Sequence, residues 1–134
     1  MADTPSNARK NFGDVVPALA DYTDKVLFGD LWERPNLSPR DRSLVTIACL
    51  ISMYRHNELP FHLKKGIENG LTRDEIAETI THLAFYGGWP VANTAIPVAR
   101  KVFEETGKCA TARSSFQAYN AAYSHESFGG ERAR

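Results

Sequence analysis

The segment SPRDRSLVTIACLISMY, residues 38–54, determines the class of fold. It begins as a helix should, because Ser38 can cap the helix, Pro39 suits its first turn and Asp41 favours the positive end of the helix dipole. The residues that follow are apolar on nearly every side, which is typical of a helix that is buried all round. A domain of this size buries a central helix only in part, so we expect another subunit to cover some of its surface.

Two further helices are expected after this segment, with a sharp boundary between them. Asn69-Gly70 closes a helical segment that begins near Glu58, because glycine adopts the left-handed conformation that ends many helices. Thr72-Arg73-Asp74-Glu75 is a capping box, which predicts the start of the next helix. Apolar residues at helical spacing continue that helix to about Tyr86.

Other helix signals flank this region on both sides. Gly87-Gly88-Trp89-Pro90 breaks the preceding helix and starts another that runs to about Thr106-Gly107, and Pro97 should kink it. Residues 8–28 form a weaker helix candidate, and the alanine-rich stretch 109–123 is a candidate for a last helix. No stretch shows the alternation of a β-strand, so the sequence predicts an all-α fold with five to six helices.

The composition is that of one globular domain. The 134 residues are 43% hydrophobic and 24% charged, which predicts a domain over 1–134 with its core at about 28–106 and a mobile tail at about 124–134. No apolar run approaches the roughly 20 residues of a membrane helix. Sixteen basic and sixteen acidic residues balance without a basic stripe, so we expect neither a membrane nor a nucleic-acid partner. The polar N-terminus has no apolar segment of the secretory type, which favours a cytoplasmic protein.

Metal and redox chemistry have little support in the sequence. Cys49 and Cys109 are 60 positions apart and form neither a CxxC pair nor a zinc-binding spacing. Cys49 lies in an apolar run, where a small buried side chain is the commoner interpretation and a reactive thiol is the alternative. No two histidines are paired at ligand spacing within one helix, so we expect no metal site.

The stretch RHNELPFHL, residues 55–63, is the clearest candidate for chemistry. Glu58 and His62 are four positions apart and therefore share one face of a helix. A carboxylate that orients an imidazole and raises its basicity is a common way to build a general acid or base. The alternative is an exposed pair near a helix start, which contributes roughly 0.2–0.5 kcal/mol. Arg55 is either an anion-binding residue or simply solvated.

A second pair, Glu78 and His82, has the same spacing on the following helix. His82 is expected toward the apolar face, where a hydrogen-bonded core histidine is commoner than a catalytic one. Packing of the two helices would also allow His82 and His62 to converge. Tyr86 and Trp89 flank a tight glycine bend that would suit either a pocket wall or the core.

Arg42 is the cation best placed to bind a carboxylate. It lies one turn into the apolar helix, with its stem expected against apolar surface and its planar guanidinium available for two parallel hydrogen bonds. A surface salt bridge with Asp41 or Asp30 is an equally open interpretation.

Three stretches resemble the carboxymuconolactone decarboxylase family: FGDLWERPNLSPRDRS at 28–43, the overlapping RDRSLVTIACLI at 40–51, and ELPFHLKKGIENGLTRDEIAETITHLAFYGGWPVANTA at 58–95. The resemblance covers roughly residues 28–104, and order, spacing and punctuation all agree. It implies an all-helical bundle of the alkyl hydroperoxidase D type. It also implies assembly into a ring-shaped homo-oligomer, a trimer or a hexamer built as a trimer of dimers.

The family has two chemical branches, and the residues favour one of them. The peroxidase branch carries Cys-x-x-Cys-x-x-x-His, and aligning its histidine with His62 puts Arg55 and Glu58 where the cysteines belong. Dithiol peroxidase chemistry is therefore excluded. The Glu-Leu-x-x-His-Leu pattern of the decarboxylase branch matches residues 58–63. That branch implies cofactor-free loss of CO2 from 4-carboxymuconolactone, giving an enol-lactone in the catabolism of aromatic compounds.

The resemblance assigns expected roles to the candidate residues. Arg42, with Arg55, would orient the carboxylates of a small-molecule substrate, and His62, steered by Glu58, would supply the proton. His82 would be a second donor near the developing enolate. No cofactor or metal is implied.

Two alternatives to this role remain. At residues 86–90 the decarboxylases carry Tyr-Cys-Gly-Ile-Pro where this chain has Tyr-Gly-Gly-Trp-Pro. Tyr86 and Trp89 are expected to bind the substrate, and the bulky Trp89 is expected to reshape the pocket. The first alternative is a lyase or isomerase acting on another small ring acid. The second is a non-enzymatic oligomer that binds a small ligand.

Overall fold

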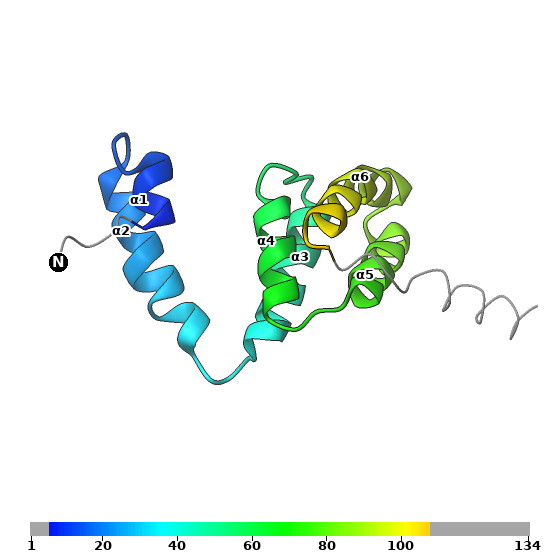
Figure 1. Cartoon of the computed structure of the whole chain (residues 1–134), viewed down its shortest axis with the longest axis horizontal. Coiled ribbons are helices and arrows are strands. Elements are labelled where there is room, and N and C mark those ends of the chain that lie inside the picture. Colours follow the sequence, from blue (N-terminus) through cyan, green and yellow to red (C-terminus); the bar gives the residue numbers. More distant parts are fainter. Residues whose placement is uncertain (1–5, 108–134) are drawn as a thin grey trace, which may run out of the picture.

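The computed structural model describes residues 6–107, and all of the regular structure within them is helical (Figure 1). This confirms the predicted all-α class. The α-helices are α1 (Asn7–Phe12), α2 (Pro17–Tyr22), α3 (Pro39–Ser52), α4 (Leu59–Glu68), α5 (Arg73–Tyr86) and α6 (Trp89–Glu105). A π-helical segment, η1 (Thr23–Phe28), and a 3-10 turn, η2 (Leu31–Glu33), lie between α2 and α3. Over residues 6–107 no helix is both long enough and apolar enough to cross a membrane. The helix predicted at 109–123 and the predicted tail lie outside the described residues.

The predicted helix boundaries of α3 and α5 are confirmed by their capping hydrogen bonds. The Ser38 hydroxyl accepts from the Asp41 amide at 3.1 Å, and Pro39 begins α3. In the capping box, the Glu75 amide donates to the Thr72 hydroxyl at 3.1 Å and the Thr72 amide donates to the Glu75 carboxylate at 2.9 Å. Each cap uses local polar groups only, which is why the sequence alone predicts it.

The region before α3 differs from the prediction, because residues 8–28 form three short elements and not one helix. The backbone of Val16, at φ −133° and ψ 68°, lies outside the helical region. Pro17 follows it, and a proline disfavours the helical conformation of the residue before it. The chain therefore leaves α1 and restarts at Pro17 as α2.

Helix α3 lies at the centre of the core and packs against α4, α5 and α6. The α3–α4 contact is especially close at Gly66, where an added Cβ would lie 2.9 Å from the Cδ1 atom of Ile47. The same interface buries the hydroxyl of Ser43, which receives a hydrogen bond of 2.9 Å from the side-chain amide of Asn69. Glycine at this crossing lets the two helices approach without a gap.

Helix α3 is not buried all round in a single chain, contrary to the expectation from its apolarity. Ile47 and Ile51 are fully buried, whereas Val45 and Cys49 on another face are exposed. The interpretation of Cys49 as a buried side chain is therefore wrong for the isolated chain.

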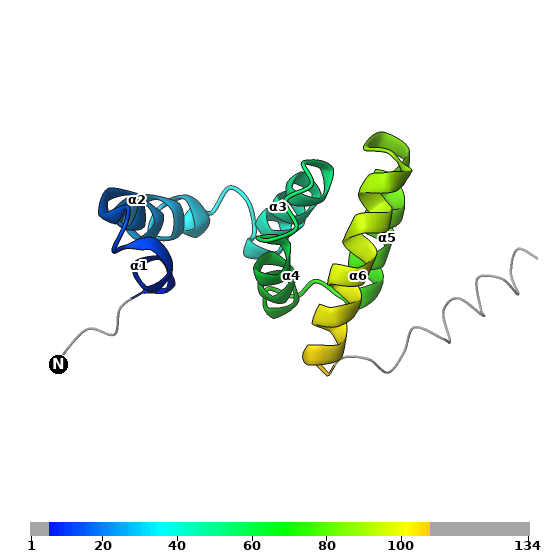
Figure 2. The same cartoon turned by 90° about the horizontal axis from the view of Figure 1, so that it is seen from above.

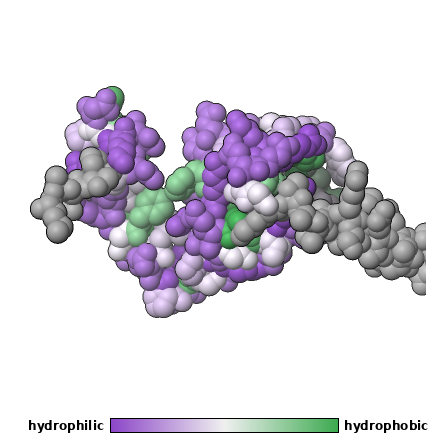
Figure 3. Space-filling model, viewed as in Figure 1, coloured by the Kyte–Doolittle hydropathy of each residue, from purple (hydrophilic) through white to green (hydrophobic). Residues whose placement is uncertain are grey.

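Residues 7–28, which we call the arm, stand apart from the four-helix core (Figures 1 and 2). The arm is held together by ion pairs such as Arg9 with Asp21, and the hydroxyl of Ser6, which caps α1, donates to Asp24 at 2.6 Å. In the space-filling view, hydrophobic surface appears on the side of the arm that faces the core (Figure 3). The chain between the arm and α3 includes η2, which contacts α3.

Candidate active site

His62 lies in the first turns of α4 and is half-buried under aromatic side chains. The ring of Trp32, from η2, stacks on it with centroids 6.4 Å apart and an interplanar angle of 25°. The ring of Phe61 meets it edge-on at 5.0 Å. The Nδ1 atom of His62 is buried and has no hydrogen-bond partner among the described residues. This polar atom is positioned to bind a group that is not part of the chain.

Burial lowers the pKa of His62 below its ordinary value of 6.5, and the charge of Glu58 opposes that shift in part. The imidazole is therefore largely neutral at pH 7 in the free protein. A negatively charged ligand beside the ring would favour its protonated form.

Glu58 precedes α4 by one residue and is exposed. Its effect on His62 is electrostatic, and in the described part of the chain no hydrogen bond joins the carboxylate to the imidazole. The structure therefore shows no hydrogen bond through which Glu58 would steer the ring, and that role of Glu58 stays a prediction. The carboxylate remains one helical turn away because residues i and i+4 share a face.

Arg42, on α3, faces the same segment of chain as His62. The Nη2 of Arg42 donates to the carbonyl of Arg34 at 2.9 Å. Arg34 is two residues beyond Trp32, and Trp32 stacks on His62. Residues 32–34 thus contact both side chains and lie over one side of the α3–α4 pair. The Nε of Arg42 is buried and has no hydrogen-bond partner among residues 6–107. A guanidinium and an imidazole, each with a buried unpaired nitrogen, suit a carboxylate ligand.

Trp32 is the site residue that spacing arguments did not find. It is 30 positions from His62 and lies outside the long helices, so no helical periodicity links the two. The only sequence signal is that Trp32 belongs to the stretch 28–43 that carries the family resemblance.

The loop between α3 and α4 holds the predicted site residue Arg55 and, next to it, His56. Arg55 is exposed, and its backbone amide donates to the carbonyl of Leu50 at 2.9 Å. His56 is half-buried, meets the ring of Tyr54 edge-on at 5.6 Å and has a buried Nδ1 without a partner in the described chain. Tyr54 has a φ of 57°, in the left-handed region that few residues other than glycine adopt. This conformation turns the chain sharply from α3 toward α4.

His82 lies on α5, at a groove between α3 and α5 of about 420 Å³. Leu44 and Ala48 of α3 line the same groove. Residues two positions apart in a helix point about 200° apart around its axis. The groove residues Leu44 and Ala48 therefore point away from Arg42 and Thr46, which lie two positions before them. The groove and the Arg42 side are therefore opposite faces of α3. A single chain does not bring His82 to His62, contrary to the predicted convergence.

Tyr86 and Trp89 lie at the corner between α5 and α6, and their ring contacts in the described chain are with residues other than His62. Tyr86 stacks on His82 with centroids 4.7 Å apart and is 80% exposed. Trp89 is 61% exposed and meets the ring of Phe85 edge-on at 5.5 Å. The expected pocket wall is thus an exposed aromatic cluster in the isolated chain.

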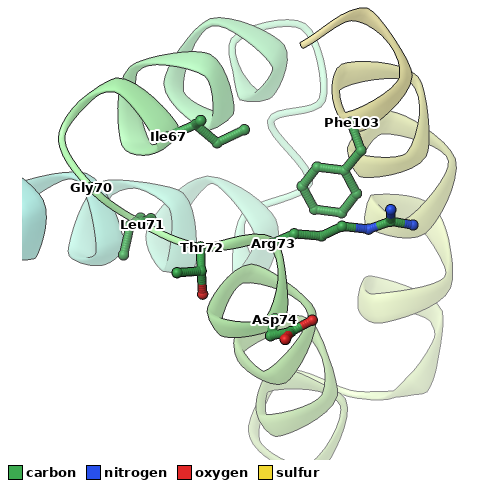
Figure 4. A pocket seen from close by; sticks show the side chains of 7 residues that line it. All are labelled: Ile67, Gly70, Leu71, Thr72, Arg73, Asp74 and Phe103. Carbon is green, nitrogen blue, oxygen red and sulfur yellow. The ribbon is translucent and has the colours of Figure 1, made fainter. Parts of the chain in front are cut away.

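A separate hollow of about 360 Å³ lies where the end of α4 meets α5 and α6 (Figure 4). Its wall includes Phe103, and the guanidinium of Arg73 lies 5.0 Å from the centre of that ring. Among the amides at the start of α5, those of Thr72 and Glu75 are already hydrogen-bonded in the capping box. Within residues 6–107 no group of three potential metal ligands is close enough to bind an ion. These features leave Arg42 and His62 as the centre of the candidate site.

Comparison with known proteins connects this site to a family. The chain is 38% identical to a 4-carboxymuconolactone decarboxylase of Acinetobacter baylyi over 98 residues, which cover 73% of each protein. It is 36% identical to a nitrosuccinic acid decarboxylase of Metarhizium robertsii over 78 residues, 58% of this chain and 54% of that protein. An uncharacterised protein of Paracoccus denitrificans is 28% identical over 93 residues, 68% of this chain and 69% of that protein. The model of the carboxymuconolactone decarboxylase family matches residues 17–101, a range that contains Trp32, Arg42 and His62. The chain belongs to the carboxymuconolactone decarboxylase family.

Proposed function

We propose that this protein is a cofactor-independent decarboxylase that acts on a small carboxylated lactone of the 4-carboxymuconolactone type, in the cytoplasmic catabolism of aromatic compounds. Decarboxylation is the activity named for the two characterised relatives. The observation that carries the proposal is the pair of buried, unpaired nitrogens on Arg42 and His62 beneath one segment of chain.

The chemistry requires an electron sink, a cation and a proton donor. When the bond to the departing carboxylate breaks, CO2 leaves and the electron pair delocalises into the unsaturated lactone carbonyl as an enolate. A proton must then be placed on carbon. Arg42 would orient the substrate carboxylates, and the guanidinium is suited to this because its donors match a carboxylate in plane.

His62 would deliver the proton. Its pKa is lowered by burial, so its protonated form is a stronger acid than an exposed histidine. The negative charge of a bound substrate would promote protonation of the ring before the reaction. Trp32 and Phe61 cover parts of the ring, which limits the access of water to the developing carbanion.

Incubation of the purified protein with 4-carboxymuconolactone is expected to release CO2 with a change in ultraviolet absorbance. A parallel incubation with nitrosuccinate distinguishes the two named substrate types of the relatives. Turnover of nitrosuccinate alone would retain the reaction class and reject the lactone. Absence of CO2 release from either acid, with tight binding of one of them, would favour a ligand-binding protein.

We also propose that the protein works as a homo-oligomer, a trimer or hexamer, in which the arm contacts another copy. Leu19, Tyr22 and Val26 recur at spacings of three and four along the continuous α2–η1 segment, so they share one stripe along the arm. They are 54%, 66% and 52% exposed in the single chain. An exposed apolar stripe of this length is typical of a surface that binds another protein.

Replacing both Leu19 and Val26 with aspartate is expected to dissociate the oligomer, because two carboxylates would be buried without partners at the contact. Analytical ultracentrifugation should then show the mass of one chain. Replacing Asn7 and Asn11 with aspartate adds the same charge to exposed positions on α1 and should leave the assembly intact. A wild-type protein that sediments as a single chain would reject the proposed assembly.

A further inference from the structure

Trp32 is carried by a turn that is held on both sides. The side chain of Arg34 donates two hydrogen bonds to the Asp30 carboxylate, at 3.0 Å and 2.6 Å, and so closes the turn that contains Trp32. The carbonyl of Arg34 accepts from Arg42 at 2.9 Å, which attaches the turn to α3. Phe28 lies on the arm side of Trp32, with ring centroids 6.0 Å apart. The indole is therefore fixed between the arm and His62.

The orientation of the His62 ring is not set by hydrogen bonds. Its Nδ1 has no partner among the described residues, and Glu58 acts on it only through charge. Within residues 6–107 its ring contacts are with the edge of Phe61, its exposed neighbour in the chain, and with the face of Trp32. Trp32 is half-buried and belongs to another element, so it can restrain the ring from outside α4.

We propose that Trp32 is a positioning residue of this site: its indole face fixes the plane of the His62 imidazole and shields that face from water. The inference rests on the proposed function, in which His62 transfers the proton. Proton transfer is sensitive to such placement, because a displacement of about 1 Å can reduce the rate roughly 10²-fold.

The charged groups on the elements around the ring include Glu58 just before α4, Arg42 on α3, and Glu33 and Arg34 beside Trp32. Of these, Glu58 is the one that shifts the pKa of His62. Its charge raises that pKa, and burial lowers it by more. Removing the indole would reduce burial and leave the Glu58 effect in place. The pKa of His62 should then rise toward 6.5.

The test compares Trp32→Ala, Trp32→Phe and the control Leu31→Ala, which alters an exposed apolar residue of the same turn. NMR titration gives the pKa of His62, with His62→Gln used to assign its signal. Trp32→Ala should raise that pKa and lower kcat by roughly 10- to 100-fold. The limb of kcat/KM that falls with rising pH should move to higher pH. Trp32→Phe should restore most of both properties, and Leu31→Ala should match the wild type.

An unchanged His62 pKa and pH profile in Trp32→Ala would overturn the inference. If Trp32→Ala does not fold, Trp32→Phe and Trp32→Leu decide the matter, since only the aromatic substitution should retain the wild-type pKa. The NMR titration needs no substrate. A protein that decarboxylates neither acid but shows the predicted pKa changes would thus reject the proposed function and keep the stacking role of Trp32.

Discussion

Replacing His62 with alanine is expected to lower kcat for decarboxylation by roughly 10²- to 10⁴-fold, the usual contribution of a positioned proton donor. The substitution should leave the fold intact, because His62 is only half-buried and lies outside the cluster of buried apolar residues. Ultraviolet assays of turnover and circular dichroism of the same samples measure the two effects separately.

Two variants of the same region serve as comparisons for His62→Ala. Glu58→Gln should lower kcat less than His62→Ala does, because it removes a charge and keeps the proton donor. It should also lower the pKa of His62 further, since the charge of Glu58 raises that pKa in the wild type. Glu68→Gln, at the exposed far end of α4, should behave as the wild type. Full activity in His62→Ala would remove this residue from the reaction. A loss in Glu58→Gln as large as that in His62→Ala would favour Glu58 as the acid.

Arg42→Gln is expected to reduce kcat/KM by roughly 10²- to 10³-fold, similar to the loss of one preorganised donor in other active sites. The glutamine cannot offer a charged fork to the substrate carboxylate. Arg42→Lys keeps the charge without the planar fork, so it should recover part of the loss. Steady-state kinetics with 4-carboxymuconolactone provides the measurement.

Arg40→Gln is the matched control for Arg42, because Arg40 lies on the same helix and lines the groove on the opposite face. It pairs with Glu75 in a partly exposed contact, and such pairs contribute little. We expect its kcat/KM to remain at the wild-type value. Equal losses in Arg40→Gln and Arg42→Gln would mean that general charge, and not a specific carboxylate contact, drives binding.

Local chemistry explains which parts of the fold could be predicted. The Ser38 and Thr72 caps and the left-handed Gly70, at φ 103°, depend on residues within one turn, so the sequence specifies them directly. The break before Pro17 was also present in the sequence, but the apolar spacing of 8–28 favoured one continuous helix. Here the backbone restriction imposed by proline outweighed the apolar pattern.

The site was harder to predict because it depends on contacts between distant segments. Two Glu/His pairs have the same spacing, and spacing does not say which pair faces Trp32 or Arg42. Packing stacks His62 on Trp32 and leaves His82 at the groove across α3. Similarly, the apolarity of α3 indicated that its surface must be buried against other protein. A sequence does not say whether the same chain or another copy buries it.

Gly66 has a consequence for the choice of substrate. Because the side chain of Ile47 on α3 packs directly against Gly66 of α4, the two helices are closely packed at this point and their separation has little room to change. Arg42 and His62 extend from these two helices, so the span between cation and proton donor has little freedom to adjust. We therefore expect selection by length: acids would react when the distance between their bound carboxylate and the carbon that accepts the proton matches this span, and shorter or longer homologues would be rejected.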